Sequence, residues 1–176
     1  MSSRLTLGLH LVRRFGRAVR PGGLSNSDQD WVQGLLSPGE TAVWDRLNNS
    51  DQRHAFGVAK AVEAELDIEA TKPVLAAALL HDSGKVVSGL RTPGRVFATL
   101  FWAVVDSSKA QAWRHGSSTK SRLAQYRLHP ELGAALLTEA GSDQLTISWA
   151  AEHHQPMASW TVPRHIGRVL KDCDDD

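Results

Sequence analysis

The chain has 176 residues, with 20 Lys and Arg residues against 19 Asp and Glu residues, and a single cysteine. This length suits one domain that buries about 70% of the surface of its unfolded chain, so no disulfide is needed for stability. The small net charge gives no general attraction to nucleic acid, and one cysteine excludes an internal disulfide and a thiolate-rich zinc site. We therefore expect a cytoplasmic protein without a nucleic-acid partner.

The amino terminus is strongly basic, because five arginines precede the first acidic residue, Asp28. Apolar residues recur among these arginines at roughly helical spacing, which predicts a basic amphipathic helix over residues 1–23. We favour a helix that packs its apolar side on the rest of the protein, residues 24–176, which we expect to form a single domain. The alternative is peripheral contact of residues 1–20 with an anionic membrane.

The following elements, in chain order, have helical signals. Ser37-Pro38-Gly39-Glu40 combines a capping box with a proline in the first helical turn, which predicts the start of a helix. Over residues 51–67, His54 shares a stripe with three apolar residues and is expected to face the core. Thr71-Lys72-Pro73 then opens a central helix whose apolar run, Val74 to Leu80, is expected to be buried.

Residues 95–105 form an inserted helix that is apolar on nearly all sides and about half as long as a membrane span. We expect this helix to be buried, partly in a homodimer interface. Further helices are predicted from Pro130 to Ala140, before His153, and after Pro163. No segment alternates polar and apolar residues with a period of two, so the predicted fold is all-α, a bundle of seven to nine helices.

The central apolar run ends directly in His81-Asp82, and a buried carboxylate is costly unless it is paired or bound to a metal. Histidines recur at other helix ends and inward faces, at His54, His129, His153 and His154. A shared ion, or a pair of ions, would satisfy all these groups in a dry interior. Imidazole and carboxylate without thiolate suit one or two divalent ions of iron, manganese, zinc, nickel or cobalt.

His54, the pair His81-Asp82 and a late aspartate resemble the HD superfamily of metal-dependent phosphohydrolases. His129-Pro130-Glu131-Leu132-Gly133-Ala134 and His153-His154 resemble its two-metal branch, which includes the HD-GYP cyclic-dinucleotide phosphodiesterases. The resemblance covers about residues 50–176. The chain departs from that branch by an insertion between Asp82 and His129, and by Thr161-Val162-Pro163 in place of Gly-Tyr-Pro. Both departures argue against cyclic di-GMP as the substrate.

The resemblance implies two metals bridged by Asp82. It assigns the first to His54, His81, Asp82 and a late aspartate, and the second to Asp82, His129 and His153, with His154 as a further ligand or beside one. The family's ending pattern selects Asp174, although helical phase scarcely separates it from Asp172. Lys85 is implied to contact a substrate phosphate and to act in catalysis with Asp82. Arg91 and Arg127 are further candidates for binding phosphate.

We therefore predict metal-dependent hydrolysis of a phosphoester in a nucleotide or another small phosphorylated metabolite. One alternative is a di-iron oxygenase on the same scaffold, against which Lys85 argues. The other is a non-catalytic metal-binding scaffold that uses the basic amino terminus and the helix at 95–105 to contact a membrane or a partner. A structural site needs only about four ligands, whereas seven are predicted here, which argues against the non-catalytic scaffold.

Overall fold

The computed structural model describes residues 22–175, which form α-helices and two short 3₁₀ helices but no strand. The α-helices are α2 (Asn26–Leu35), α3 (Pro38–Trp44), α4 (Asn49–Leu66), α5 (Lys72–Leu80), α6 (Lys85–Ser88), α7 (Thr92–Val104), α8 (Lys109–Trp113), α9 (Thr119–Arg127), α10 (His129–Glu139), α11 (Gln144–Glu152) and α12 (Arg164–Asp175). The 3₁₀ helices are η1 (Asp67–Glu69) and η2 (Met157–Ser159). Nine of the α-helices have seven or more residues, so the predicted all-α bundle is confirmed. The helix predicted over residues 1–23 falls almost entirely outside the described residues.

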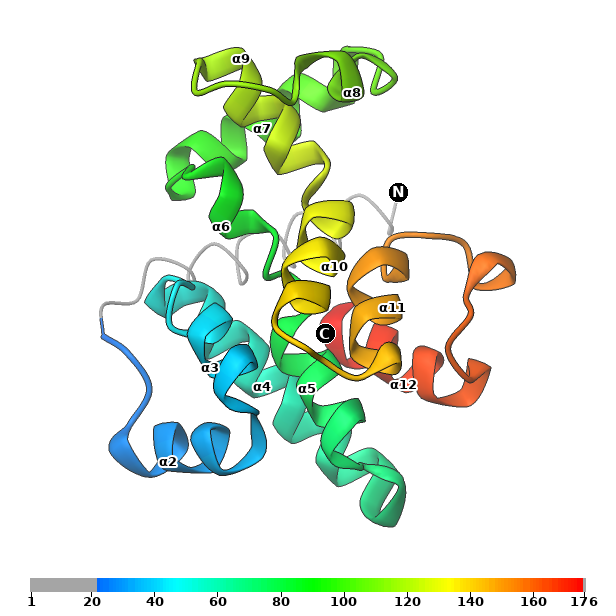
Figure 1. Cartoon of the computed structure of the whole chain (residues 1–176). Helices are drawn as coiled ribbons and strands as arrows, with labels where there is room; N and C mark the ends of the chain where they lie inside the picture. Colours follow the sequence, from blue (N-terminus) through cyan, green and yellow to red (C-terminus); the bar gives the residue numbers. More distant parts are fainter. Residues whose placement is uncertain (1–21, 176) are drawn as a thin grey trace, which may run out of the picture.

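Helix α5 is the centre of the bundle (Figure 1). Every residue from Val74 to Leu80 is buried, as the uninterrupted apolar run predicts. Helices α4 and α11 pack against α5, while α12 packs on α4 and α10 packs on α11. The carboxyl end of α5, where His81 follows, therefore lies among the four helices that supply the other site residues.

A capping box fixes the start of α3, as predicted. The main-chain N–H of Ser37 donates to the Glu40 carboxylate at 2.9 Å, and the N–H of Glu40 donates to Ser37 Oγ at 3.3 Å. The same turn packs closely on the end of α10, since a Cβ added at Gly39 would lie 2.2 Å from the Ala140 carbonyl oxygen. Glycine is thus required where α3 meets α10.

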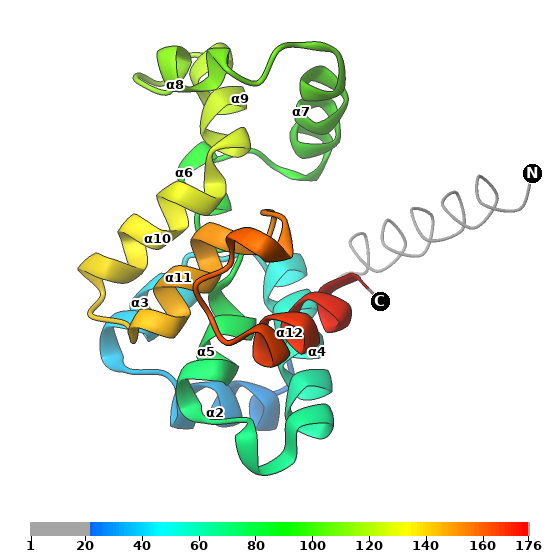
Figure 2. The ribbon, with the colours of Figure 1, turned by 90° about the vertical axis from the view of Figure 1, so that its right-hand side faces the viewer.

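Residues 85–127, comprising helices α6 to α9, project from one end of the bundle as a lobe (Figures 1 and 2). The α6–α9 lobe has its own small apolar cluster, in which Trp102 and Trp113 pack against buried alanines. Trp102 Nε1–H also donates to the Leu123 carbonyl oxygen at 2.8 Å, which joins α7 to α9. The lobe is tied to α4 by Arg95, whose Nη1 lies 2.6 Å and 2.7 Å from the two carboxylate oxygens of Asp51.

The expected burial of the helix at 95–105 is wrong for the single chain. This helix is α7, and Ala98 is its one buried residue. Val96, Phe97, Leu100 and Val104 are instead 46–85% exposed. The inner side of α7 contacts α9, but no element of residues 22–175 covers the outer side. The predicted homodimer through this helix stays a prediction, and no helix between residues 22 and 175 combines the length and apolarity needed to cross a membrane.

Candidate metal centre

Five helices bring histidine and aspartate side chains to one end of the bundle core. His81 and Asp82 follow the last residue of α5, and His129 is the first residue of α10. His153 directly follows α11, while α4 supplies His54 and α12 supplies Asp174. Helix ends are suitable positions, because side chains there reach a common point without crossing the packed helix faces.

Three of these histidines are oriented in the same way by a carbonyl of the helix that precedes them. The Nδ1 atoms of His81 and His129 lie 2.9 Å and 2.8 Å from the carbonyl oxygens of Ala78 and Tyr126, three residues earlier. His153 Nδ1 lies 3.0 Å from the Ala150 carbonyl oxygen. Because a carbonyl oxygen only accepts, each Nδ1 must carry a proton, and the neutral imidazole then presents the Nε2 lone pair to the interior. This is the common arrangement of metal-binding histidines.

The carboxylate of Asp82 lies between two groups of donor atoms. Its Oδ1 is 3.1 Å from His129 Nε2 and 3.7 Å from His153 Nε2. Its Oδ2 is 3.4 Å from His81 Nε2 and accepts a hydrogen bond from Lys85 Nζ. One carboxylate therefore offers an oxygen atom to each side of the cluster.

The second group of donor atoms is built around Asp174. Its Oδ1 is 2.8 Å from His54 Nε2 and 3.5 Å from His81 Nε2. Asp174 is buried, whereas Asp172 on the same helix is exposed. Of the two aspartates that the sequence scarcely separated, the structure thus brings only Asp174 to the cluster.

The described residues thus contain two groups that could each bind a metal ion. One consists of Asp82, His129, His153 and His154, and the other of His54, His81 and Asp174. Within each group the donor atoms lie within 4.8 Å of one another. His154 is exposed at the surface, and its ring centroid lies 5.2 Å from that of His129.

Four buried atoms of this cluster that could bind a metal have no hydrogen-bond partner. They are His81 Nε2, Asp82 Oδ1, His129 Nε2 and His153 Nε2. Each unsatisfied buried polar atom costs about 1–3 kcal/mol, and native structures contain few of them. Divalent cations bound by the two groups would satisfy all four, and a set of imidazoles and carboxylates without thiolate suits a first-row transition metal. The donor set therefore fits a metal.

The close packing of histidines and aspartates shifts the pKa values of several groups in the cluster. Burial alone would lower the pKa of His81, but the negative charges of Asp82 and Asp174 outweigh burial and raise this pKa to about 10. Burial opposes ionisation of both aspartates, yet Lys85 and His81 hold the pKa of Asp82 well below its usual range. The neighbouring His54 and His81 do the same for Asp174. Burial lowers the pKa of His129, so that its imidazole is neutral.

The three predicted cationic residues lie in different surroundings. Lys85 is largely buried beside Asp82, and the charge of Asp82 outweighs burial and raises the lysine pKa. Arg91 and Arg127 are exposed, at the start of α7 and the end of α9. In the described part of the chain, neither arginine forms an ion pair with Asp82 or Asp174.

A glycine contact that sequence reasoning missed sets the position of α10 relative to α5. A Cβ added at Gly84 would lie 1.9 Å from the carbonyl oxygen of His129 and 2.5 Å from the main-chain nitrogen of Gly133. The two backbones therefore touch beside the cluster. Gly84 lies two residues after Asp82 and Gly133 lies four residues after His129, but their contact with each other has no signal in the sequence.

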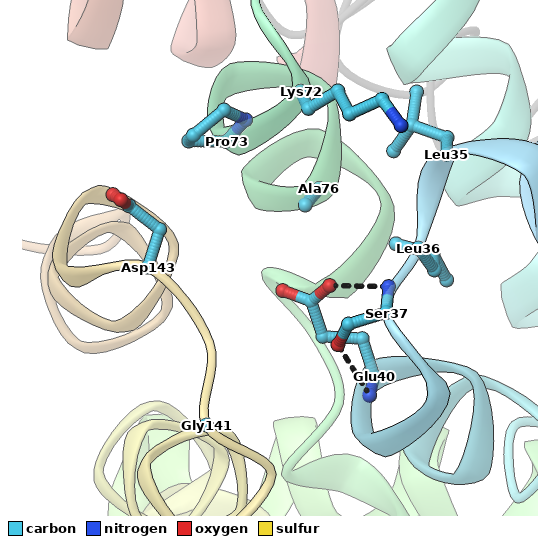
Figure 3. Close-up of a pocket in the computed structure, with 9 residues that line it drawn as sticks. All are labelled: Leu35, Leu36, Ser37, Glu40, Lys72, Pro73, Ala76, Gly141 and Asp143. Carbon is cyan, nitrogen blue, oxygen red and sulfur yellow. Dashed lines mark hydrogen bonds between the residues drawn. The ribbon is translucent and has the colours of Figure 1, made fainter.

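The pocket drawn in Figure 3 is separate from this cluster. It has a volume of about 320 Å³ and lies between the capping box of α3, the start of α5 and the loop that ends at Asp143. Lys72 and Leu36 are among its lining residues, and none of the donor residues lines it. The pocket is built mainly from apolar and capping side chains, apart from the residues that could bind a metal.

The described residues thus fold into a helical bundle with two neighbouring histidine and aspartate groups that could bind metal. Three of the histidines are held with Nδ1 on a main-chain carbonyl and Nε2 toward the cluster, and Asp82 faces both groups. Comparisons with protein-family models, with curated proteins and with solved structures find no match.

Proposed function

We propose that this protein is a metal-dependent phosphohydrolase of the HD type that cleaves a phosphoester in a nucleotide or another small phosphorylated metabolite. The observation that supports it best is the position of Asp82, whose two oxygens face different donor groups. A carboxylate shared in this way is suited to joining two metal ions. Two-metal sites are common in enzymes that displace groups at phosphorus.

The residues of the chain have distinct tasks in this proposal. His54, His81, Asp82 and Asp174 would hold one metal, and Asp82 with His129, His153 and His154 would hold the other. Metal ions bound there would supply Lewis acidity and an activated water molecule. The Nδ1–H bonds to main-chain carbonyls fix the orientation of three imidazoles, so little reorganisation is needed during the reaction.

Lys85 supports phosphoester chemistry rather than another reaction of the same metals. Its ammonium group is held beside Asp82, and its raised pKa keeps it charged at neutral pH. A fixed cation in a partly buried site stabilises negative charge that develops on phosphoryl oxygens in the transition state.

The test combines metal analysis of the purified full chain with a panel of phosphoesters that includes p-nitrophenyl esters, nucleotides, and cyclic mono- and dinucleotides. We expect at least one transition metal per chain and phosphoester cleavage that a chelator abolishes. Asp82→Ala should lose metal and activity together, whereas Asp30→Ala, an exposed aspartate on α2, should keep both. Full metal content in Asp82→Ala would refute the site. Turnover only of non-phosphate compounds, and only with oxygen, would favour the oxygenase.

A further inference from the structure

Helix α7 presents a continuous apolar stripe to solvent. Val96, Phe97, Leu100 and Val104 are 46%, 57%, 65% and 85% exposed. Their spacing along the helix places them on one side, while Trp102 packs the other side onto the rest of the lobe. Large apolar residues gathered in one exposed patch mark an interaction site in folded proteins.

The lobe that includes this stripe is strongly basic, although the whole chain is nearly neutral. Residues 85–127 contain eight of the 20 Lys and Arg residues but only one of the 19 Asp and Glu residues, Asp106. Two of the eight, Lys85 and Arg95, are paired with Asp82 and Asp51. The other six are exposed: Arg91, Lys109, Arg114, Lys120, Arg122 and Arg127.

We infer that the α6–α9 lobe binds the surface of an anionic lipid bilayer. The stripe of α7 enters the boundary between headgroups and acyl chains, and the exposed cations contact lipid phosphates and carboxylates. Helix α7 has 13 residues and is too short to span a bilayer, so it lies in the plane of the interface. Apolar area combined with basic charge is the combination that such surfaces select.

Charge separates this partner from the other surfaces that could cover the stripe. A second copy joined through α7 would bring two lobes with six exposed cations each against one another. The amino-terminal segment is also basic, with five arginines and no acid before Asp28, so its charge repels the lobe. Nucleic acid matches the charge, but its phosphate backbone leaves protruding Phe97 and Leu100 exposed to water.

The test is sedimentation of the full chain with vesicles of phosphatidylcholine alone or with about 30% phosphatidylserine. We expect binding to the anionic vesicles only, and weaker binding at high salt. Phe97→Glu combined with Leu100→Glu should reduce binding at least about tenfold. Lys109→Gln combined with Arg114→Gln should reduce it several-fold, since each cation adds to the attraction. Ile68→Glu, which is 89% exposed but outside the lobe, is the matched control and should bind as before.

Several outcomes would overturn the inference. These are equal binding to both vesicle types, no binding to either, or retention of binding by the Phe97 and Leu100 double variant. Loss of binding in Arg13→Glu combined with Arg17→Glu, while the α7 variant still binds, would assign the contact to the amino terminus. A dimer in sedimentation equilibrium that the α7 variant dissociates would identify a second copy as the partner. Helix content and metal content of each variant show whether it is folded, and the lipid and salt dependence of the unchanged protein tests the inference without any substitution.

Discussion

Gly84 lies against the main chain of His129 with no room for a side chain between them. A Cβ at residue 84 would be 1.9 Å from the His129 carbonyl oxygen. This contact joins the turn after Asp82 to the start of α10, and each of these two segments supplies donors to the cluster. The position of His129 relative to Asp82 therefore depends on the absence of one methyl group.

Gly84→Ala is expected to lower the free energy of unfolding by about 2–3 kcal/mol, because the added methyl group must displace backbone rather than a flexible side chain. It should also reduce metal content, since α10 moves with His129. Gly57→Ala on α4 is the control, because no atom lies within 4 Å of its added Cβ, and it should be neutral or stabilising by about 0.5–1 kcal/mol. Denaturant unfolding and metal analysis provide the readouts. Equal effects of the two substitutions would show that the contact is unimportant.

Asp174 and Asp172 form a matched pair on α12. Asp174 is buried beside His54 and His81, whereas Asp172 is exposed two residues earlier. We expect Asp174→Ala to weaken metal binding at least about a hundredfold, and Asp172→Ala to leave it unchanged. Competition with a chromogenic chelator measures both affinities. The assignment would be reversed if the Asp172 variant were the one that lost metal.

His81 should release a proton when a metal binds. Its pKa of about 10 in the metal-free protein means that it is protonated at neutral pH, whereas a ligand must be neutral. We expect release of at least one proton per chain at neutral pH, measured by calorimetry in buffers of different ionisation enthalpy. Binding without proton release would contradict ligation by His81.

The same shift in the pKa of His81 predicts how the stability of the metal-free protein varies with pH. The folded pKa of about 10 lies above the unfolded value of 6.5, so protonated His81 stabilises the fold fully below about pH 6.5. This contribution is lost as the pH rises from 6.5 towards 10. Denaturant unfolding across this window should show falling stability in metal-free protein, and His81→Ala should remove that part of the slope.

Lys85→Met is expected to separate catalysis from metal binding. The substitution removes the cation beside Asp82 but no donor atom of either group. Metal content should therefore be unchanged, while kcat for phosphoester cleavage should fall by about 10²–10³-fold, as for removal of another fixed electrostatic group. Lys72→Met at the opposite end of α5 is the control, because Lys72 lies on the separate pocket. Unchanged turnover in Lys85→Met would exclude the lysine from the reaction.

The sequence predicted those features that depend on local pattern. The capping box at Ser37 and Glu40, the burial of Val74 to Leu80 and the all-α class follow from side-chain type and spacing within one segment. The sequence also predicted the types of the donor residues and their positions at helix ends, because polar residues that interrupt apolar helices are easily recognised.

The sequence did not predict features that depend on the packing of distant segments. Residues 95–105 were expected to be buried, because a sequence that is apolar on all sides does not reveal which side lacks a neighbouring helix. The contact of Gly84 with His129 requires a particular approach of α5 and α10. Likewise, the shared position of Asp82 depends on α10 and α11, which bring His129 and His153 to its Oδ1.

The two ends of the α6–α9 lobe both lie next to residues of the cluster. The chain enters the lobe three residues after Asp82 and leaves it two residues before His129, whose Nε2 lies 3.1 Å from Asp82 Oδ1. Because both ends of the lobe lie next to donor residues, a tilt of the lobe would change this distance.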